Sequence, residues 1–258
     1  MRVIRVQYKG AVFFAALEEN GVHCLNRQLG YTAPIPLADV AILPVVAPSK
    51  VICAGLNYSD HARELDMAVP AQPVFFLKAP SSIIGNGSPI LLPAGVGRVD
   101  YEAELAIVMG KHARNISPEA VNEHIFGYTC ANDVTAREIQ KRDGLFGRCK
   151  GYDTFCPVGP WIETQVDDPG SLGVRTLVNG DVRQEGHTSD MLFHPHEVVS
   201  AISEVMTLLP GDIILTGTPA GIGPLRNGDE VRVEIESVGV LINPVIAEDG
   251  RDEDVPLQ

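Results

Sequence analysis

The sequence predicts an α+β protein that is rich in β-strands and contains one dominant mixed sheet. Short runs of strand-forming residues follow one another along most of the chain, few segments show helical periodicity, and no internal repeat is present. The clearest strand pair is 174–178 with 181–184, because the Asn179-Gly180 dipeptide between them favours a type I′ hairpin turn. Further turn signals separate other runs: Gly85-Asn86-Gly87, Gly159-Pro160 and Asn227-Gly228.

The N-terminal part is expected to be a small β module. Residues 2–8, 11–17 and 21–25 have the pattern of short strands with turns between them. Residues 30–50 lose this periodicity and contain four prolines, which indicates a connector. We therefore expect three parts: a module and connector over 1–49, a larger domain over 50–246, and an acidic C-terminal tail over 247–258.

Helices are expected at only a few places. Residues 118–124 form a short one, and 195–208 carry the clearest amphipathic pattern. A third helix is expected over 135–141. It begins with Thr135-Ala-Arg-Glu138, which has the spacing of a capping box.

Composition excludes several classes of partner. The 258 residues carry a formal net charge of −13 and no basic run, so a nucleic-acid partner is not expected. The five cysteines form no CxxC motif and suit a reducing compartment. No apolar run is long enough to span a bilayer, and Met1 leads directly into a strand pattern rather than a signal peptide. The sequence thus predicts a cytoplasmic protein without a membrane partner.

Two glutamates in one strand are the first sign of chemistry. Glu102 and Glu104 are two residues apart in a segment with strand periodicity, so their side chains point to the same face. Like charges this close destabilise a strand unless a cation neutralises them. The opposite face is apolar and is expected to pack in a core: Ala103, Leu105, Ile107 and Met109.

Asp133 is the best candidate for a third ligand. It follows an apolar strand pattern and precedes the predicted helix. One interpretation makes Asp133 the N-cap of that helix, but Thr135 with Glu138 supplies a cap and leaves the Asp133 carboxylate free. Three carboxylates without Cys or His suit Mg²⁺ rather than zinc. Spacing alone leaves open a metal site and a solvated acidic pair.

Three further side chains of this region are candidates for a ligand site. Arg137 and Gln140 are three residues apart and share one helical face, from which Arg137 could bind a carboxylate. The alternative is a surface arginine that pairs with Glu138 or Asp143. Lys150 lies in a segment that becomes apolar, and it is either a functional cation held near carboxylates or a solvated loop lysine.

A possible general base and a possible anion-binding loop complete the set. His61 and Glu64 have i, i+3 spacing, in which a carboxylate orients an imidazole and raises its basicity. An exposed short helix with an incidental pair is the alternative. Residues 215–224 are rich in glycine, and the backbone N–H groups around Gly217 with the Thr218 hydroxyl could meet a ligand carboxylate. A simple tight turn is the alternative there.

Taken together, these segments resemble the fumarylacetoacetate hydrolase family. The resemblance covers about residues 50–245, with the motifs in the family's order, and the first 50 residues resemble the small extra module of many members. It rests on five strings: Gly55-Leu-Asn-Tyr-Ser-Asp-His61, Asp100-Tyr-Glu-Ala-Glu-Leu105, Asn132-Asp-Val-Thr-Ala-Arg137, Val178-Asn-Gly-Asp-Val-Arg-Gln-Glu-Gly186 and Asp212-Ile-Ile-Leu-Thr-Gly-Thr-Pro219.

The resemblance implies a fold, a cofactor and roles for the candidate residues. It implies a mixed β-sheet roll with few helices, a homodimer, and one Mg²⁺ or Mn²⁺ ion bound by Glu102, Glu104 and Asp133. It also implies a His61–Glu64 pair on a mobile lid and a catalytic cation at Lys150. The substrate site is implied to include four residues: Arg137, Gln140, Gly217 and Thr218.

The chain is similar to the compact branch of the family, which contains acylpyruvate hydrolases, oxaloacetate decarboxylases and hydroxymuconate-type isomerases. The resemblance implies a small 2-oxo or 2-hydroxy-dienoic acid as substrate and an enolate stabilised by the metal ion. A C–C bond hydrolase or isomerase of aromatic-compound breakdown, of the acylpyruvate or 2-hydroxyhepta-2,4-diene-1,7-dioate type, is the leading expectation. Oxaloacetate decarboxylation is the alternative. A binder without catalysis and a metal-dependent phosphoesterase are more distant ones.

Overall fold

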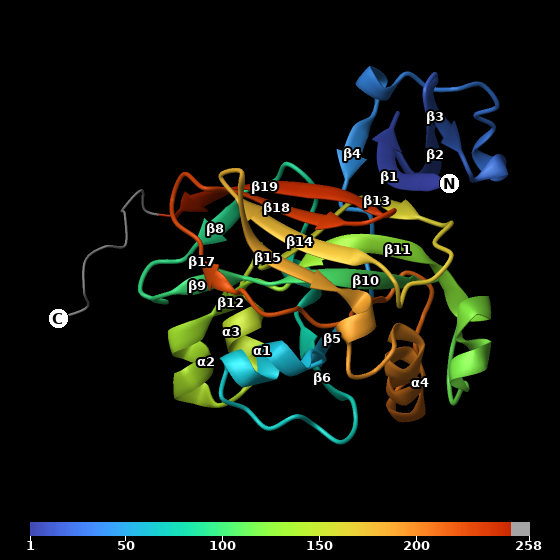
Figure 1. Cartoon of the computed structure of the whole chain (residues 1–258). Coiled ribbons are helices and arrows are strands. Elements are labelled where there is room, and N and C mark those ends of the chain that lie inside the picture. The colour runs from blue at the N-terminus through green and yellow to red at the C-terminus, as the bar shows by residue number, and fades with distance from the viewer. Residues whose placement is uncertain (249–258) are drawn as a thin grey trace.

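The computed structural model describes residues 1–248 and is built around two sheets stacked on each other (Figure 1). The larger sheet has eleven strands, with the order β3-β2-β1-β13-β11-β10-β16-β5-β6, while β4 pairs with β1 and β7 with β13. Its strands are β1 (Arg2–Tyr8), β2 (Ala11–Glu18), β3 (Gly21–Cys24), β4 (Ala41–Leu43), β5 (Val51–Gly55), β6 (Val74–Lys78), β7 (Ile83–Ile84), β10 (Ala103–Met109), β11 (Ile125–Asn132), β13 (Cys156–Glu163) and β16 (Ile213–Leu215).

The second sheet has five strands, with the order β15-β14-β18-β19-β8, and covers one face of the first (Figure 1). Apolar side chains from β10, β11, β14 and β18 fill the space between the sheets. Its β14–β15 hairpin turns at Asn179-Gly180, which confirms the predicted strand pair. The five strands are β8 (Ile90–Leu92), β14 (Gly173–Val178), β15 (Asp181–His187), β18 (Glu230–Ile235) and β19 (Gly239–Ala247).

Strand β10 lies at the centre of the larger sheet and is buried along its whole length. Its odd-numbered residues from Ala103 to Met109 point into the core between the sheets, as the alternating pattern predicted. Ala106 and Val108 belong to a second core on the opposite face. The side chains of Glu102 and Glu104 therefore point to the face away from the core between the sheets.

A third sheet of three short strands holds the start of β10 against the helices. It consists of β9 (Val99–Tyr101), β12 (Thr135–Ala136) and β17 (Gly223–Pro224), in the order β12-β9-β17. Thr135 is paired with Asp100 across the antiparallel strands β12 and β9. Two residues further along this register, Asp133 lies next to Glu102, so the pairing brings two of the predicted metal ligands together.

The α-helices are short, and three of them gather near the start of β10 (Figure 1). None of the helices within residues 1–248 is long and apolar enough to cross a membrane. The α-helices are α1 (Ser59–Glu64), α2 (Arg137–Asp143), α3 (Phe146–Lys150) and α4 (Pro195–Val205), and the 3₁₀ turns are η1 (Arg27–Leu29), η2 (Leu37–Asp39), η3 (Pro80–Ser82), η4 (Pro118–His124) and η5 (Thr188–Asp190).

The three N-terminal strands and the η4 turn form where they were predicted, but the predicted capping box at Thr135 is wrong. Thr135 lies in β12, its hydroxyl donates to the carbonyl of Asp133, and α2 begins two residues later without a side-chain cap. Strand pairing with Asp100 fixes Thr135 in an extended conformation, which removes it from the helix. Helix α4 ends at Val205, before the predicted end, because Met206 is extended. Helix α3 was not predicted.

The N-terminal module is joined to the larger sheet by strand pairing. Arg2 and Val3 of β1 are paired with Glu163 and Ile162 of β13. Beyond this junction the module has a small core of its own, formed around Ile4, Val6 and Phe13. The predicted boundaries at 49 and 246 stay a prediction, and most of the predicted acidic tail lies outside the described residues.

Candidate active site

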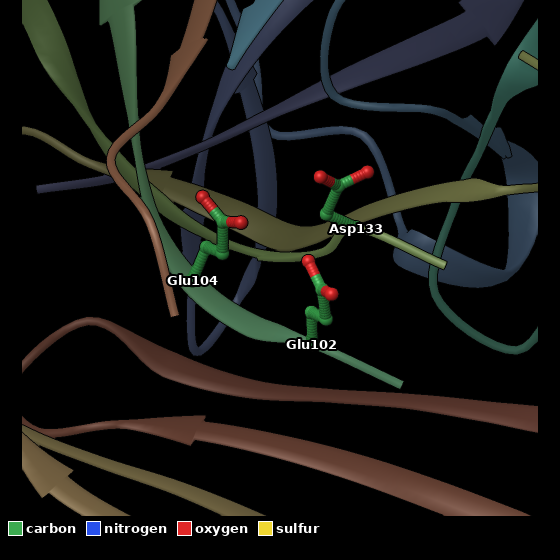
Figure 2. A group of neighbouring side chains, drawn as sticks. All are labelled: Glu102, Glu104 and Asp133. Carbon is green, nitrogen blue, oxygen red and sulfur yellow. The ribbon is translucent and has the colours of Figure 1, made fainter. Parts of the chain in front are cut away.

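Three carboxylates converge at the start of β10. Glu102, Glu104 and Asp133 each offer an oxygen, and these oxygens all lie within 4.8 Å of one another. The three side chains are buried and lie next to one another (Figure 2). They form the single group of this kind in residues 1–248. The spacing of Glu102 and Glu104 thus brings both carboxylates together, and Asp133 joins them from the end of β11.

Backbone hydrogen bonds hold Asp133 beside Glu102. The N–H of Asp133 donates to the carbonyl of Glu102 at 2.9 Å. The N–H of Glu102 in turn donates to the side-chain oxygen of Asn132, also at 2.9 Å. These bonds continue the β10–β11 ladder beyond its last paired residues. The position of Asp133 therefore follows from the strand register and not from a helix cap.

Two buried lysines flank Asp133. Lys150 donates to Asp133 Oδ2 at 2.5 Å and to Glu102 Oε2 at 2.8 Å. Lys78, from the end of β6, donates to Asp133 Oδ1 at 2.5 Å and to the carbonyl of Val134 at 3.3 Å. Both lysines are almost completely shielded from solvent, so the interpretation of Lys150 as a solvated loop lysine is wrong. Helix α3 turns Lys150 inward.

Arg137 lies behind Glu102. It donates to Asp100 Oδ2 at 2.7 Å, to Glu102 Oε1 at 2.5 Å and to Gln140 Oε1 at 3.0 Å. The residue is only 5 % exposed, so the surface-pair alternative for Arg137 is wrong. Since Arg137 occupies the Gln140 oxygen, the Gln140 amide nitrogen is left as a donor.

The electrostatics of the three carboxylates are unequal. Burial and the neighbouring Asp133 and Glu102 raise the pKa of Glu104 well above its usual range. Burial alone would also raise the pKa of Glu102, but Lys150 and Arg137 outweigh it and hold that pKa below its usual range. Glu104 receives one hydrogen bond, from the N–H of Gly217 at 2.5 Å. Negative charge is therefore least compensated around Glu104.

This donor set fits a hard divalent cation. All three ligands are carboxylate oxygens, which are the donors that Mg²⁺ and Mn²⁺ prefer. The lysines and Arg137 compensate Glu102 and Asp133 but leave Glu104 short of positive charge. A cation held by Glu102, Glu104 and Asp133 would supply it. No thiolate or imidazole belongs to the group, which disfavours zinc.

His61 and Glu64 form a hydrogen-bonded pair on α1. The Nδ1 atom of His61 lies 3.0 Å from Glu64 Oε2, and His61 is buried. Helix α1 is therefore not wholly exposed, although Glu64 itself is. The other Glu64 oxygen accepts from the N–H of Gly221 at 3.1 Å, so the pair is tied to the glycine-rich loop. An ionised carboxylate only accepts hydrogen bonds, so it favours the tautomer with the proton on Nδ1 and a basic Nε2.

The glycine-rich loop contributes to the site in two ways. The N–H of Gly217 is used by Glu104, so it orients a candidate metal ligand. The Thr218 side chain is buried and lines the pocket, where its oxygen accepts a hydrogen bond from Gln184 Nε2 at 2.8 Å. The predicted substrate contacts of Gly217 and Thr218 stay predictions.

The pocket has a polar and an apolar side. The polar side consists of His61, Gln140, Lys150, Thr218 and the three carboxylates, whereas Glu64, Arg137 and Gly217 support it from outside the lining. Its cavity volume is ≈ 30 Å³. The apolar lining comes from β5 and the residue after it, from the residues after α1, and from β6 and α3: Ala54, Leu56, Leu65, Met67, Phe76 and Phe146.

Sequence reasoning missed three buried residues that support the site. Lys78 could have been found from the sequence, since it ends an apolar strand pattern in which a lysine is unusual. Asp100 accepts hydrogen bonds from Arg98 and Arg137, but it was considered only as part of a motif. Gln184 stood in the hairpin string without a role, and its contacts with Ala103 and Thr218 could not be found from local sequence.

Comparison with known proteins places the chain in a family. The family described as Fumarylacetoacetate (FAA) hydrolase C-terminal matches residues 50–246. The chain belongs to the fumarylacetoacetate hydrolase family. As a member of this family it is an enzyme, and its strand-rich fold and its likeness to the compact branch agree with the sequence prediction.

Named relatives of this family member include enzymes of different reactions. The mitochondrial oxaloacetate tautomerase Fahd2a of Rattus norvegicus is 42% identical over 252 residues, with 92% of this chain and 80% of the relative covered. The crystal structure of 2-hydroxyhepta-2,4-diene-1,7-dioate isomerase from Mycobacterium marinum has a TM-score of 0.85 and 45% identity, covering 96% of this chain and 99% of that one. Maleylpyruvate hydrolase from Sphingobium sp. SYK-6, in complex with manganese(II) and pyruvate, has a TM-score of 0.80 and 34% identity, with 96% and 99% covered.

Proposed function

We propose that this enzyme binds Mg²⁺ or Mn²⁺ and acts on small 2-oxo or 2-hydroxy-dienoic acids through an enolate, as a C–C bond hydrolase or isomerase. The observation that carries the proposal is the buried group Glu102, Glu104 and Asp133, with Lys150 bonded to two of its members. The manganese and pyruvate in the related maleylpyruvate hydrolase support the same ligand chemistry. The proposed metal ligands are the three carboxylates.

The polar side of the pocket supplies the groups that this chemistry needs. When bound, the divalent cation supplies a Lewis acid for the 2-oxo group. Lys150 places a further positive charge beside the oxygen on which negative charge develops. Gln140 and Thr218 line the pocket, where the amide and the hydroxyl can bind and orient the substrate carboxylate.

His61 is the proposed general base. Glu64 orients its ring through Nδ1 and leaves Nε2 to take a proton, either from water in a hydrolase or from carbon in an isomerase. In hydrolysis, the activated water attacks the distal carbonyl. The C–C bond then breaks, and its electrons pass to the 2-oxo acid, which leaves as an enolate. Nε2 of His61 can then return the proton to the enolate carbon that was part of the broken bond.

Helix α1 and the residues that follow it border this pocket. His61 of α1 belongs to its lining, and so do Leu65 and Met67 just after the helix. We propose that α1 with residues 65–73 forms a lid that opens for the substrate and closes over it, which excludes water from the reaction.

The apolar side of the pocket favours acylpyruvate-type substrates over oxaloacetate. Phe76 and Phe146 have ring centroids 4.8 Å apart, and Met67 lies beside them in the lining. A distal acyl group would bury apolar surface there. A second carboxylate would have to share Lys150, which lies 5.2 Å from the Phe76 ring and is already bonded to Glu102 and Asp133. Oxaloacetate decarboxylation remains the second candidate, because the rat relative is an oxaloacetate tautomerase.

A turnover panel tests the proposal. The purified protein is incubated with Mg²⁺, Mn²⁺ or a chelator, and acetylpyruvate, fumarylpyruvate, oxaloacetate and a hydroxymuconate-type dienoate are compared. We expect turnover of at least one substrate that depends on the metal ion and is abolished in Glu104→Ala. Undiminished turnover in Glu104→Ala would remove the metal role, and turnover of oxaloacetate alone would favour the second candidate.

Assembly and location are part of the same proposal. The family resemblance supports a homodimer. Sedimentation of the purified protein would test this by giving the mass of the assembly in solution. The five free thiols suit a reducing compartment such as the cytoplasm. Fractionation of cells that express the chain would test this location.

A further inference from the structure

Gln184 is a fully buried glutamine that joins the strand of the acidic residues to the loop of Thr218. Its Oε1 accepts from the N–H of Ala103 at 3.0 Å and from the Thr176 hydroxyl at 2.7 Å. Its Nε2 donates to Thr218 Oγ1 and to the carbonyl of Pro219, both at 2.8 Å. Ala103 is the residue between Glu102 and Glu104. The Gln184 side chain therefore connects the strand of the acidic residues with the loop that carries Thr218.

The orientation of the Gln184 amide is fixed because one of its partners can only donate a hydrogen bond and another can only accept one. The backbone N–H of Ala103 can only donate, so the atom facing it must be the oxygen. The carbonyl of Pro219 can only accept, so the atom facing it must be the nitrogen. The amide cannot be flipped without losing both bonds. Nitrogen therefore faces Thr218.

This orientation determines what the Thr218 hydroxyl can do. Its oxygen accepts the N–H of Gln184, which leaves the hydroxyl proton to be donated elsewhere. Among the hydrogen bonds of residues 1–248, none uses that proton, and Thr218 lines the pocket. Because the Gln184 nitrogen cannot accept, the hydroxyl proton is directed away from Gln184 and is available to an acceptor such as a carboxylate oxygen.

The surrounding backbone is shaped to bring Gln184 to this place. In the β14–β15 ladder Thr176 is paired with Gln184 but Leu177 with Val182, so Arg183 is an extra residue in β15. Such a bulge re-aims a side chain, and bulges occur often beside active sites. The chain also approaches the loop closely, since a Cβ at Gly186 would lie 2.5 Å from the Pro219 side chain.

We propose that Gln184 is a positioning residue that commits the Thr218 hydroxyl to donate to the substrate carboxylate. The assignment rests on the proposed function, because it needs a substrate with a carboxylate in this pocket. Gln184 touches neither substrate nor metal ion in this assignment, and it acts through Thr218. Through Ala103 it also fixes the distance between the donor and the acidic group.

The test is pyruvate binding in the presence of Mn²⁺, measured by calorimetry, with Mn²⁺ binding measured separately. The variants are Gln184→Met, Thr218→Val, Thr218→Ser and the double variant Gln184→Met/Thr218→Val. Thr218→Val should weaken pyruvate binding about ten-fold or more, because a hydrogen bond to a charged group is lost. Gln184→Met should weaken it in the wild-type background but add little to Thr218→Val. Thr218→Ser keeps the hydroxyl and should bind like the wild type.

Several outcomes would overturn the assignment. Wild-type pyruvate affinity in Thr218→Val would show that its hydroxyl is not the donor. An equal loss from Gln184→Met in both backgrounds would show a merely structural role. If Gln184→Met does not fold, Gln184→Glu replaces it, because its carboxylate accepts the Thr218 proton and should weaken pyruvate binding at least as much as Thr218→Val. A wild-type protein that binds Mn²⁺ but no 2-oxo acid would overturn the proposed function itself, and this assignment with it.

Discussion

Lys78 and Asp133 form an ion pair that is shut off from solvent, with Nζ 2.5 Å from Oδ1. The lysine comes from β6, at the edge of the larger sheet, and the aspartate from the end of β11. Lys78 does not line the pocket, whereas Lys150, on the other oxygen of Asp133, does. The two lysines therefore bind the same carboxylate from different sides.

Lys78→Met should destabilise the metal-free protein strongly. Breaking a buried pair leaves an uncompensated charge, which costs about 3–5 kcal/mol of unfolding free energy. Added Mn²⁺ should recover part of this loss, because the cation supplies positive charge to Asp133. Urea denaturation with and without Mn²⁺ measures both effects, and Lys111→Met, at an exposed position, is the control. Equal stabilities of Lys78→Met and wild type would contradict the role of the pair.

Mn²⁺ should raise the melting temperature of the wild type but not of Glu104→Gln. Ion binding at about 100 times the dissociation constant contributes about 2.7 kcal/mol, a shift of several degrees for a chain of this size. Glu104→Gln keeps an acceptor for Gly217 and removes one crowded charge, so its metal-free form should melt at or above the wild-type temperature. Thermal denaturation with chelator and with Mn²⁺ checks this. The control is Glu119→Gln, at an exposed residue.

Strand periodicity was enough to predict the core face of β10 and the shared direction of Glu102 and Glu104. Both follow from an alternation that is local to a few residues. The place of Asp133 was predicted, but for a wrong reason: strand pairing and the β10–β11 register hold it, since Thr135 is not a cap. A local pattern cannot tell a capping box from a strand when the strand partner is distant in sequence.

The partners of the acidic group could not be predicted from local sequence. Lys78 meets Asp133 across 55 residues, and Gln184 meets Ala103 across 81. Nothing in the neighbourhood of either residue encodes the other, because the sheet order brings them together. For the same reason, residue spacing favoured solvated roles for Arg137 and Lys150, and only the folded sheet shows that both are buried.

Replacing His61 should separate catalysis from binding. His61→Ala should lower kcat by about 100- to 10,000-fold, the range expected for a lost general base. Pyruvate binding with Mn²⁺ should persist, because the carboxylates, Lys150 and Thr218 are unchanged. Glu64→Gln should lower kcat less, since the imidazole remains but loses its charged partner. Steady-state kinetics and calorimetry distinguish the outcomes, and a full kcat in His61→Ala would assign the base elsewhere.

Phe146→Arg should change substrate preference. The cation beside the Phe76 ring is Lys150, at 5.2 Å, and it is already bonded to Glu102 and Asp133. The substitution would supply a separate cation to a second carboxylate. We expect kcat/KM for acetylpyruvate to fall and kcat/KM for a dicarboxylate such as fumarylpyruvate to rise. Phe146→Leu is the matched control, which keeps an apolar wall and should keep the wild-type preference. An unchanged ratio in Phe146→Arg would mean that the distal group binds elsewhere.

Asp212 should make the stability of the fold depend on pH in the acidic range. Its carboxylate accepts from Ser49, Lys50 and Leu209, and so fastens the start of β5 to the start of β16. Burial alone would raise the pKa of Asp212, but the hydrogen bonds from Lys50, Ser49 and Leu209 outweigh it and lower that pKa.

Because the pKa of Asp212 is lower in the folded than in the unfolded protein, its stabilisation is complete above the unfolded value near 4 and is lost as the pH falls through the folded value. Asp212→Asn should therefore cost about 2–3 kcal/mol at pH 7, since hydrogen bonds to a charged group are weakened. The difference from wild type should shrink at pH 3, where the wild-type carboxyl also begins to lose its charge. Urea denaturation at the two pH values measures the difference in unfolding free energy between wild type and Asp212→Asn. An equal difference at both pH values would mean that the charge of Asp212 does not stabilise the junction of β5 and β16.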